Sequence, residues 1–168
     1  MMINEIVIYI DCCPNYNQIE NLFIKILEIE SNDLSIKYTM MDDWFFTNEK
    51  KVSVIDTKNL SDKICRIELF ENKSSRGIIT IEMNDGIYQI DMYVRNNFIH
   101  KVDLQFVENV KQIFNSFRFI AIGDDFLIGE GNNIKNIISS SSGVELWIFP
   151  FDNDKKIIQK LNLLNEAI

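Results

Sequence analysis

The chain has 168 residues, of which 46% are apolar and 25% charged, and its formal net charge is −8. These values are typical of one soluble globular domain, so we expect residues 1–168 to fold as a single unit. The acidic surplus argues against nucleic acids and anionic membranes as partners, because both bind basic surfaces. No apolar run reaches the roughly 20 residues that cross a bilayer. Asn4 and Glu5 stand where a secretory signal would carry basic residues, so we predict a cytoplasmic protein.

The first 30 residues predict a buried strand followed by a helix. Residues 3–10 form a nearly continuous apolar run, which is typical of a strand covered on both faces. Pro14 ends this run, and Asn17 with Glu20 three residues later has the spacing of a capping box. Apolar residues then recur at helical spacing, which predicts an amphipathic helix over residues 16–30.

Residues 34–95 alternate between apolar and polar side chains, which predicts an antiparallel meander of about five strands with one face in solvent. The best-defined part is a hairpin over residues 77–94. Asp85-Gly86 suits a two-residue type I′ turn, and a turn at Asn84-Asp85 with Gly86 as a bulge would keep the same register. Apolar then faces apolar and polar faces polar, in the pairs Met83–Tyr88, Ile81–Ile90, Ile79–Met92, Glu82–Gln89 and Thr80–Asp91. A slip of one residue would destroy this match.

The last third of the chain predicts a helix over residues 103–116, a short strand over 119–122 and a helical turn over 134–138. A strand over 144–149 follows, and Asp152 is expected to cap a final helix. The predicted fold class is α+β, with an antiparallel β-meander sheet of about five or more strands packed by two or three amphipathic helices.

Cys12 and Cys13 lie between the first strand and the first helix. A thiol near a helix N-terminus has a lowered pKa and is a better nucleophile. A strand, then Cys-Pro, then a helix resembles the opening of thioredoxin-type domains, which implies redox activity, although Tyr16 stands where the second cysteine of a Cys-x-x-Cys motif would be. The alternative is a small buried side chain. The three cysteines, Cys12, Cys13 and Cys65, show no disulfide or metal-ligand spacing, so we expect reduced thiols.

A polar and aromatic loop over residues 41–51 gives the best candidate for a binding surface. Its candidate residues are Asp42, Asp43, Trp44, Phe45 and Glu49. Exposed aromatic side chains supply buried contact area in protein interfaces, and carboxylates select a basic partner. The alternative is that the aromatic side chains fold back to close the core.

No catalytic residue, metal site or cofactor is predicted. Asp124 and Asp125, with three glycines nearby, have neither the EF-hand nor the Walker spacing. His100 is the single histidine, and a Ser-His-Asp hydrolase would depend on it alone.

The sequence therefore favours a non-catalytic acidic domain that binds a basic protein partner. Bacterial immunity proteins, which neutralise a cognate toxin by covering its basic active site, have this size and charge. Two alternatives remain open: a thiol-dependent enzyme that uses Cys12 or Cys13, and a structural subunit that associates with itself, for example as a homodimer.

Overall fold

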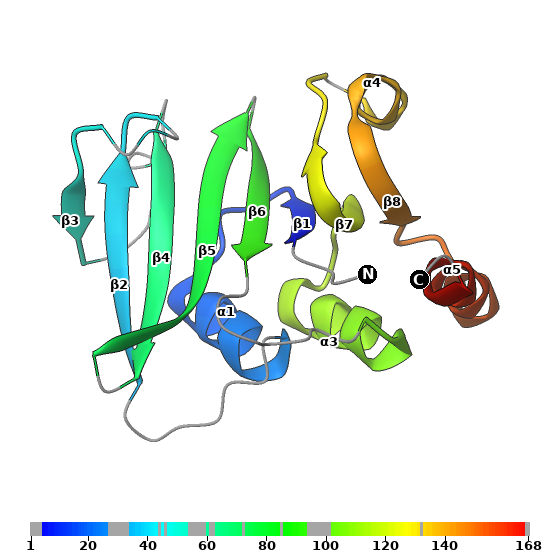
Figure 1. Ribbon diagram of the computed structural model, residues 1–168, viewed down its shortest axis with the longest axis horizontal. Helices are drawn as coiled ribbons and strands as arrows, with labels where there is room; N and C mark the ends of the chain where they lie inside the picture. The colour runs from blue at the N-terminus through cyan, green and yellow to red at the C-terminus, as the bar shows by residue number, and fades with distance from the viewer. Residues whose placement is uncertain are drawn as a thin grey trace.

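The computed structural model describes residues 5–26, 34–43, 45, 47–53, 60, 63–71, 73–84, 86–93, 102–131 and 133–166. They form an α+β protein around one eight-stranded antiparallel sheet, in the order β3-β2-β4-β5-β6-β1-β7-β8 (Figure 1). The strands are β1 (Glu5–Ile10), β2 (Leu34–Met41), β3 (Lys50–Val52), β4 (Ile64–Glu71), β5 (Ser74–Asn84), β6 (Ile87–Tyr93), β7 (Phe119–Leu127) and β8 (Ser142–Ile148). The sheet is thus larger than the predicted meander.

Four helices accompany the sheet in the described part of the chain. They are α1 (Tyr16–Asn21), which continues as a π-helical turn η1 (Leu22–Ile26), α3 (Leu104–Phe114), α4 (Ile134–Ser140) and α5 (Asp154–Glu166). Figure 1 shows α1 and α3 side by side, and α4 and α5 near opposite ends of β8. None of the helices in the described ranges is long and apolar enough to span a bilayer.

The central hairpin has the predicted register. Ile79 of β5 lies opposite Met92 of β6, and Thr80 lies opposite Asp91. Gly86 has a φ of +77°, a conformation that glycine adopts without steric cost. Its neighbour Asp85 lies outside the described residues. The register predicted by pairing polar with polar and apolar with apolar side chains across the two strands is therefore confirmed.

The strand order differs from a meander in two places. β3 pairs with the outer edge of β2, so β4 returns to the other edge of β2 rather than following β3. β1 lies in the interior of the sheet, between β6 and β7, although both of these neighbours come much later in the sequence. The apolar run of β1 indicated burial, but nothing local in it specifies these partners.

β1 separates two apolar clusters on opposite faces of the sheet. Ile6, Ile8 and Ile10 belong to the larger cluster, which also contains buried side chains of α1, η1, α3 and α5. Val7 and Tyr9 belong to a smaller cluster with side chains of β7 and α4. Because successive strand side chains point to opposite faces, a strand buried on both sides needs an almost unbroken apolar sequence.

Two of the predicted helix starts are corrected by the structure. The capping box of α1 uses Asn15 and Gln18, not Asn17 and Glu20: the Asn15 side chain accepts from the Gln18 backbone N–H at 2.9 Å, and the Gln18 side chain accepts from the Asn15 N–H at 2.9 Å. Asn15 has the extended backbone that a capping residue needs. At α5, the side chain that accepts from a first-turn N–H is that of Asn153, and Asp152 has a different role.

Candidate binding cleft on the sheet

The predicted loop after β2 is a turn that its own two aspartates hold in shape. Asp42 accepts from the Lys63 ammonium at 2.9 Å and from the Asn48 amide at 2.6 Å. These hydrogen bonds lower the pKa of Asp42. Asp43 accepts from the backbone N–H of Phe45 at 2.9 Å. Both carboxylates therefore bind groups of their own chain, which reduces what they offer to a partner.

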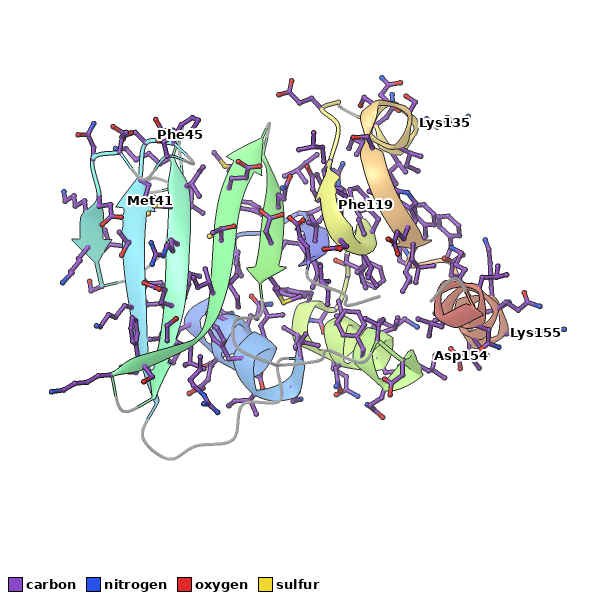
Figure 2. All side chains as sticks on the ribbon, in the orientation of Figure 1. Met41, Phe45, Phe119, Lys135, Asp154 and Lys155 are labelled. Atoms are coloured by element: carbon purple, nitrogen blue, oxygen red, sulfur yellow. The ribbon has the colours of Figure 1, made fainter. Side chains whose placement is uncertain are left out.

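Phe45 lies at the tip of this turn with 87% of its surface exposed. Figure 2 shows it near the end of β2, at the edge of the sheet formed by the ends of the strands. Glu49 is also exposed, and Trp44 lies outside the described residues. The structure thus brings Asp42 and Asp43 together at the base of a turn that presents an aromatic ring to solvent.

The three cysteines are not part of this turn, although Cys65 lies opposite Met40 in the strand that leads into it. Cys12 is exposed, Cys13 is half-buried and packs against the larger apolar cluster, and Cys65 is buried in it. Burial raises the pKa of Cys65 to about 12, so this thiol stays protonated at neutral pH. The backbone N–H groups that open α1 are used partly by the Asn15 cap.

A cleft of about 590 Å³ lies on the face of the sheet that carries the smaller apolar cluster. Its floor is formed by β1, β5 and β6, and one wall is formed by the end of β7 and the segment that follows. Its lining residues are Glu5, Val7, Tyr9, Glu82, Ile87, Gln89, Asp91, Phe126, Leu127, Ile128, Gly129, Glu130 and Gly131. Four of them carry a carboxyl group, and none of these lining residues is a lysine, an arginine or a histidine.

The floor of the cleft contains a chain of hydrogen bonds that ends on Asp91. The Tyr9 hydroxyl donates to Gln89 Oε1 at 2.6 Å, and Gln89 Nε2 donates to Asp91 Oδ1 at 2.9 Å. The Thr80 hydroxyl donates to Asp91 Oδ2 at 3.3 Å from the neighbouring strand. Asp91 is only 2% exposed, and all of these donors are neutral. Its negative charge would therefore have no cation beside it among its two hydrogen-bond donors, Gln89 and Thr80.

The electrostatic environment of the floor is negative. The pKa of Asp91 is raised to about 8, mainly by burial, with smaller contributions from Glu82 and Glu5, while the hydrogen bonds from Gln89 and Thr80 oppose the change. Burial also raises the pKa of Tyr9 above its usual value, with contributions from Glu82, Asp91 and Glu130. Carboxylates from three separate parts of the chain therefore act on the same small region.

The wall of the cleft is held in place by Gly129. Its backbone N–H donates to the Ser141 hydroxyl at 2.8 Å. A Cβ atom at this position would lie 2.6 Å from the carbonyl carbon of Ser140, which is closer than real Cβ contacts allow. Only glycine lets the segment after β7 approach the end of α4 so closely. The strand predicted over residues 119–122 continues through Asp124 and Asp125 to Leu127 as β7.

The sequence predicted how the hairpin side chains that line this cleft are paired, but it did not predict the cleft. It paired Thr80 with Asp91 and Glu82 with Gln89 on the polar face of the hairpin, and it treated that face as solvated. The signal that was available is Asp91, an acidic residue in the middle of a strand opposite a threonine. Glu5 and Glu130 were not assigned to this face, because β1 and the segment after β7 reach the hairpin only through the tertiary fold.

No group of three or more metal-ligating side chains in the described ranges is arranged to hold a metal ion. Comparison with known proteins adds no assignment: no protein-family model matches the chain, and neither a curated protein nor a solved structure is similar to it at a significant level.

Proposed function

We propose that this chain is a non-catalytic binding domain for a basic protein partner, in the manner of an immunity protein that covers a cationic toxin surface. The observation that carries the proposal is the cleft, which Glu5, Glu82, Asp91 and Glu130 line. An apolar cleft with a few polar groups is the usual form of a binding site. Here the polar groups are mainly acidic, so a cationic surface is the complementary one.

The charge of the whole chain supports the same partner. A net charge of −8 attracts a basic protein from a distance and raises the rate of association. Low-dielectric walls concentrate this field in a cleft. The cleft would thus act both as the region of strongest attraction and as the place of contact.

Phe45 is proposed as a second contact. Its ring is exposed on a turn that Asp42 and Asp43 stabilise, so little conformational entropy is lost when a partner covers it. Aromatic side chains of this kind dominate the binding energy of many interfaces. Asp42, Asp43 and Glu49 would surround this contact with negative charge.

The test uses the basic proteins that the reading frames on either side of the gene encode. Binding to the purified chain is measured by biolayer interferometry at low and at physiological salt. We expect nanomolar to micromolar binding to one of them, and we expect Glu82→Gln with Glu130→Gln to slow association at least fivefold at low salt.

The matched control removes the same charge from exposed positions away from the cleft, by Glu145→Gln with Asp154→Asn. Phe45→Ala in the otherwise unchanged chain should increase the dissociation rate instead. Equal association rates for the cleft double variant and the control would reject the cleft as the contact surface. Failure of every basic neighbour to bind would reject the proposed function.

A further inference from the structure

We propose that the cleft binds one basic side chain of the partner, which extends over Asp91 with its charge among Glu5, Glu82 and Glu130 and its aliphatic stem on the apolar lining. This inference rests on the proposed function and specifies the chemical group that the cleft would recognise. An arginine side chain has the required form, because its guanidinium group can donate to several carboxylates at once.

The shape of the cleft agrees with a side chain rather than a single ion. A volume of about 590 Å³ lies within the range of sites that bind small organic molecules. Ile87 and Phe126 are buried in the smaller apolar cluster and also line the cleft. Such a surface suits the methylene groups of arginine or lysine, which pack on apolar side chains while the charged end stays with polar groups.

The acidic groups reach the cleft from different elements. Glu5 comes from β1, Glu82 from β5 and Glu130 from the segment after β7. Glu82 and Glu130 both act on the Tyr9 hydroxyl, and Glu82 and Glu5 both act on Asp91. A cation above Asp91 and Tyr9 would therefore interact favourably with the glutamates that act on these two residues, which is more than a single surface ion pair offers.

Asp91 gives the site a measurable response to charge. Among the described residues, the groups that face it are Glu82 and Thr80 of β5, Gln89 of its own strand, and Glu5 and Tyr9 of β1. Arg66 of β4 is one strand further away, opposite Thr80, and forms an ion pair with Glu68 at 2.6 Å. Because its pKa is about 8, Asp91 is largely protonated at pH 7. A cation bound above it would favour the ionised carboxylate, so binding should release a proton.

The first experiment compares two peptides that differ only in charge, acetyl-Gly-Arg-Gly-amide and acetyl-Gly-citrulline-Gly-amide. Each is titrated into the intact chain labelled with ¹⁵N, and amide shifts are followed. We expect saturable shifts at Gln89, Asp91 and Glu130 with the arginine peptide, and at least tenfold weaker binding of the citrulline peptide. Equal binding of both peptides, or no saturable shift at these residues, would overturn the inference.

The second experiment measures the proton. Calorimetric titration of the arginine peptide at pH 7 in two buffers of different ionisation enthalpy gives the number of protons released. We expect more than half a proton per peptide for the unchanged chain, none for Asp91→Asn, and tighter binding as the pH rises from 6 to 8. Binding without proton release in the unchanged chain would place the cation elsewhere and overturn the inference.

The two proposals fail in different ways. If a basic neighbour protein binds and requires Glu82 and Glu130, but the arginine peptide leaves the cleft unperturbed, the proposed function stands and the single side-chain site is wrong. If the peptide binds as expected but no basic neighbour protein binds, the site stands and the proposed partner class is wrong. The Glu145→Gln with Asp154→Asn variant serves as the control in both.

Discussion

Two aspartates are almost equally buried in this protein, and their surroundings are opposite. Asp91, at the floor of the cleft, is 2% exposed, and Asp152, before α5, is 3% exposed. The partners of Asp91 are neutral and its charged neighbours are acidic. Asp152 forms an ion pair with Lys156 at 2.8 Å, and it accepts hydrogen bonds from Lys160 at 2.5 Å and from the Phe149 N–H at 2.9 Å.

The pKa values follow these surroundings. Burial would raise the pKa of Asp152, but hydrogen bonds from Lys156, Lys160 and the Phe149 backbone together lower it. The same burial raises the pKa of Asp91 to about 8. A buried carboxylate that its own chain neutralises stabilises the fold, whereas one that lacks a cation among its partners costs stability and is typical of a functional site. The comparison separates a structural region from a candidate binding region.

The largest expected effect is that of Asp91→Asn on the pH dependence of stability. The native state holds the Asp91 proton up to a pH of about 8, whereas the unfolded chain loses it near pH 4, so the stability of the unchanged chain falls as pH rises between these values. The slope from this group approaches about 1.4 kcal/mol per pH unit. The variant should lack this slope and be several kcal/mol more stable than the unchanged chain at pH 8. Urea unfolding at pH 5, 6.5 and 8 measures the free energy of unfolding of both proteins. If the two free energies changed with pH in parallel, the prediction would be contradicted.

Asp152→Asn should have the opposite sign. It removes the charge that two lysines bind, and we expect a loss of about 2–3 kcal/mol at pH 7. Because the folded pKa of Asp152 is lowered, its contribution is present above the unfolded value and disappears as pH falls below about 4. The same urea series, extended to pH 3, measures both the loss of stability at pH 7 and its disappearance at low pH. A difference between variant and unchanged chain that persists undiminished at pH 3 would show that packing, not charge, is responsible.

Gly129→Ala should disturb the cleft and leave the Asp152 region intact. The added Cβ would lie 2.0 Å from the Ser140 hydroxyl oxygen and 2.6 Å from its carbonyl carbon, so the wall must move. We expect a loss of about 1–3 kcal/mol. As the wall moves, water should reach Asp91, and the pKa of its carboxyl group should fall toward the ordinary value because the group is less buried. NMR titration of the Asp91 carboxyl carbon measures this pKa. Gly86→Ala, at a turn with open space around it, is a control for backbone strain alone.

The smallest expected difference lies between the two lysines that bind Asp152. Lys160 also donates to the Trp147 carbonyl at 2.7 Å and is mostly buried, whereas half of the Lys156 side chain is exposed. Lys160→Met should cost about 1–2 kcal/mol and Lys156→Met less than about 1 kcal/mol. Thermal unfolding at pH 7 compares them. Equal losses would mean that solvent screens both ion pairs to the same degree.

Local patterns predicted much of this fold. The hairpin register followed from alternation, and the apolar stripe predicted a helix from about Asp103. In the structure α3 begins at Leu104, and the Asp103 side chain caps it by accepting from the Phe106 N–H at 2.9 Å. Competition between neighbouring polar residues was harder to resolve. Asn15 precedes the first helix and Asn17 lies in its first turn, whereas Asp152 and Asn153 both precede the last helix. At the first helix, Asn15 forms the cap together with Gln18. At the last helix, Lys156 and Lys160 bind the Asp152 carboxylate, and Asn153 forms the cap.

The cleft could not be predicted for a different reason. It combines side chains from residues 5–9, 82–91 and 126–131. Within each of these segments, the pattern of polar and apolar residues is accounted for by the local secondary structure, so no segment by itself indicates a binding site. Only the placement of β1 between β6 and β7 brings them together. That placement depends on contacts between distant segments, which leave no local signature. The candidate residues of the turn after β2 could be proposed from the sequence because they are adjacent in it.

The interior position of β1 also has a consequence for synthesis. The ribosome releases β1 long before Ile87–Tyr93 and Phe119–Leu127, the two strands that pair with it. Until both have emerged, a nascent chain carries an apolar strand with two open edges. Such a segment is prone to aggregate and is slow to find distant partners. Chaperones that hold nascent chains are therefore expected to bind this protein near its first strand.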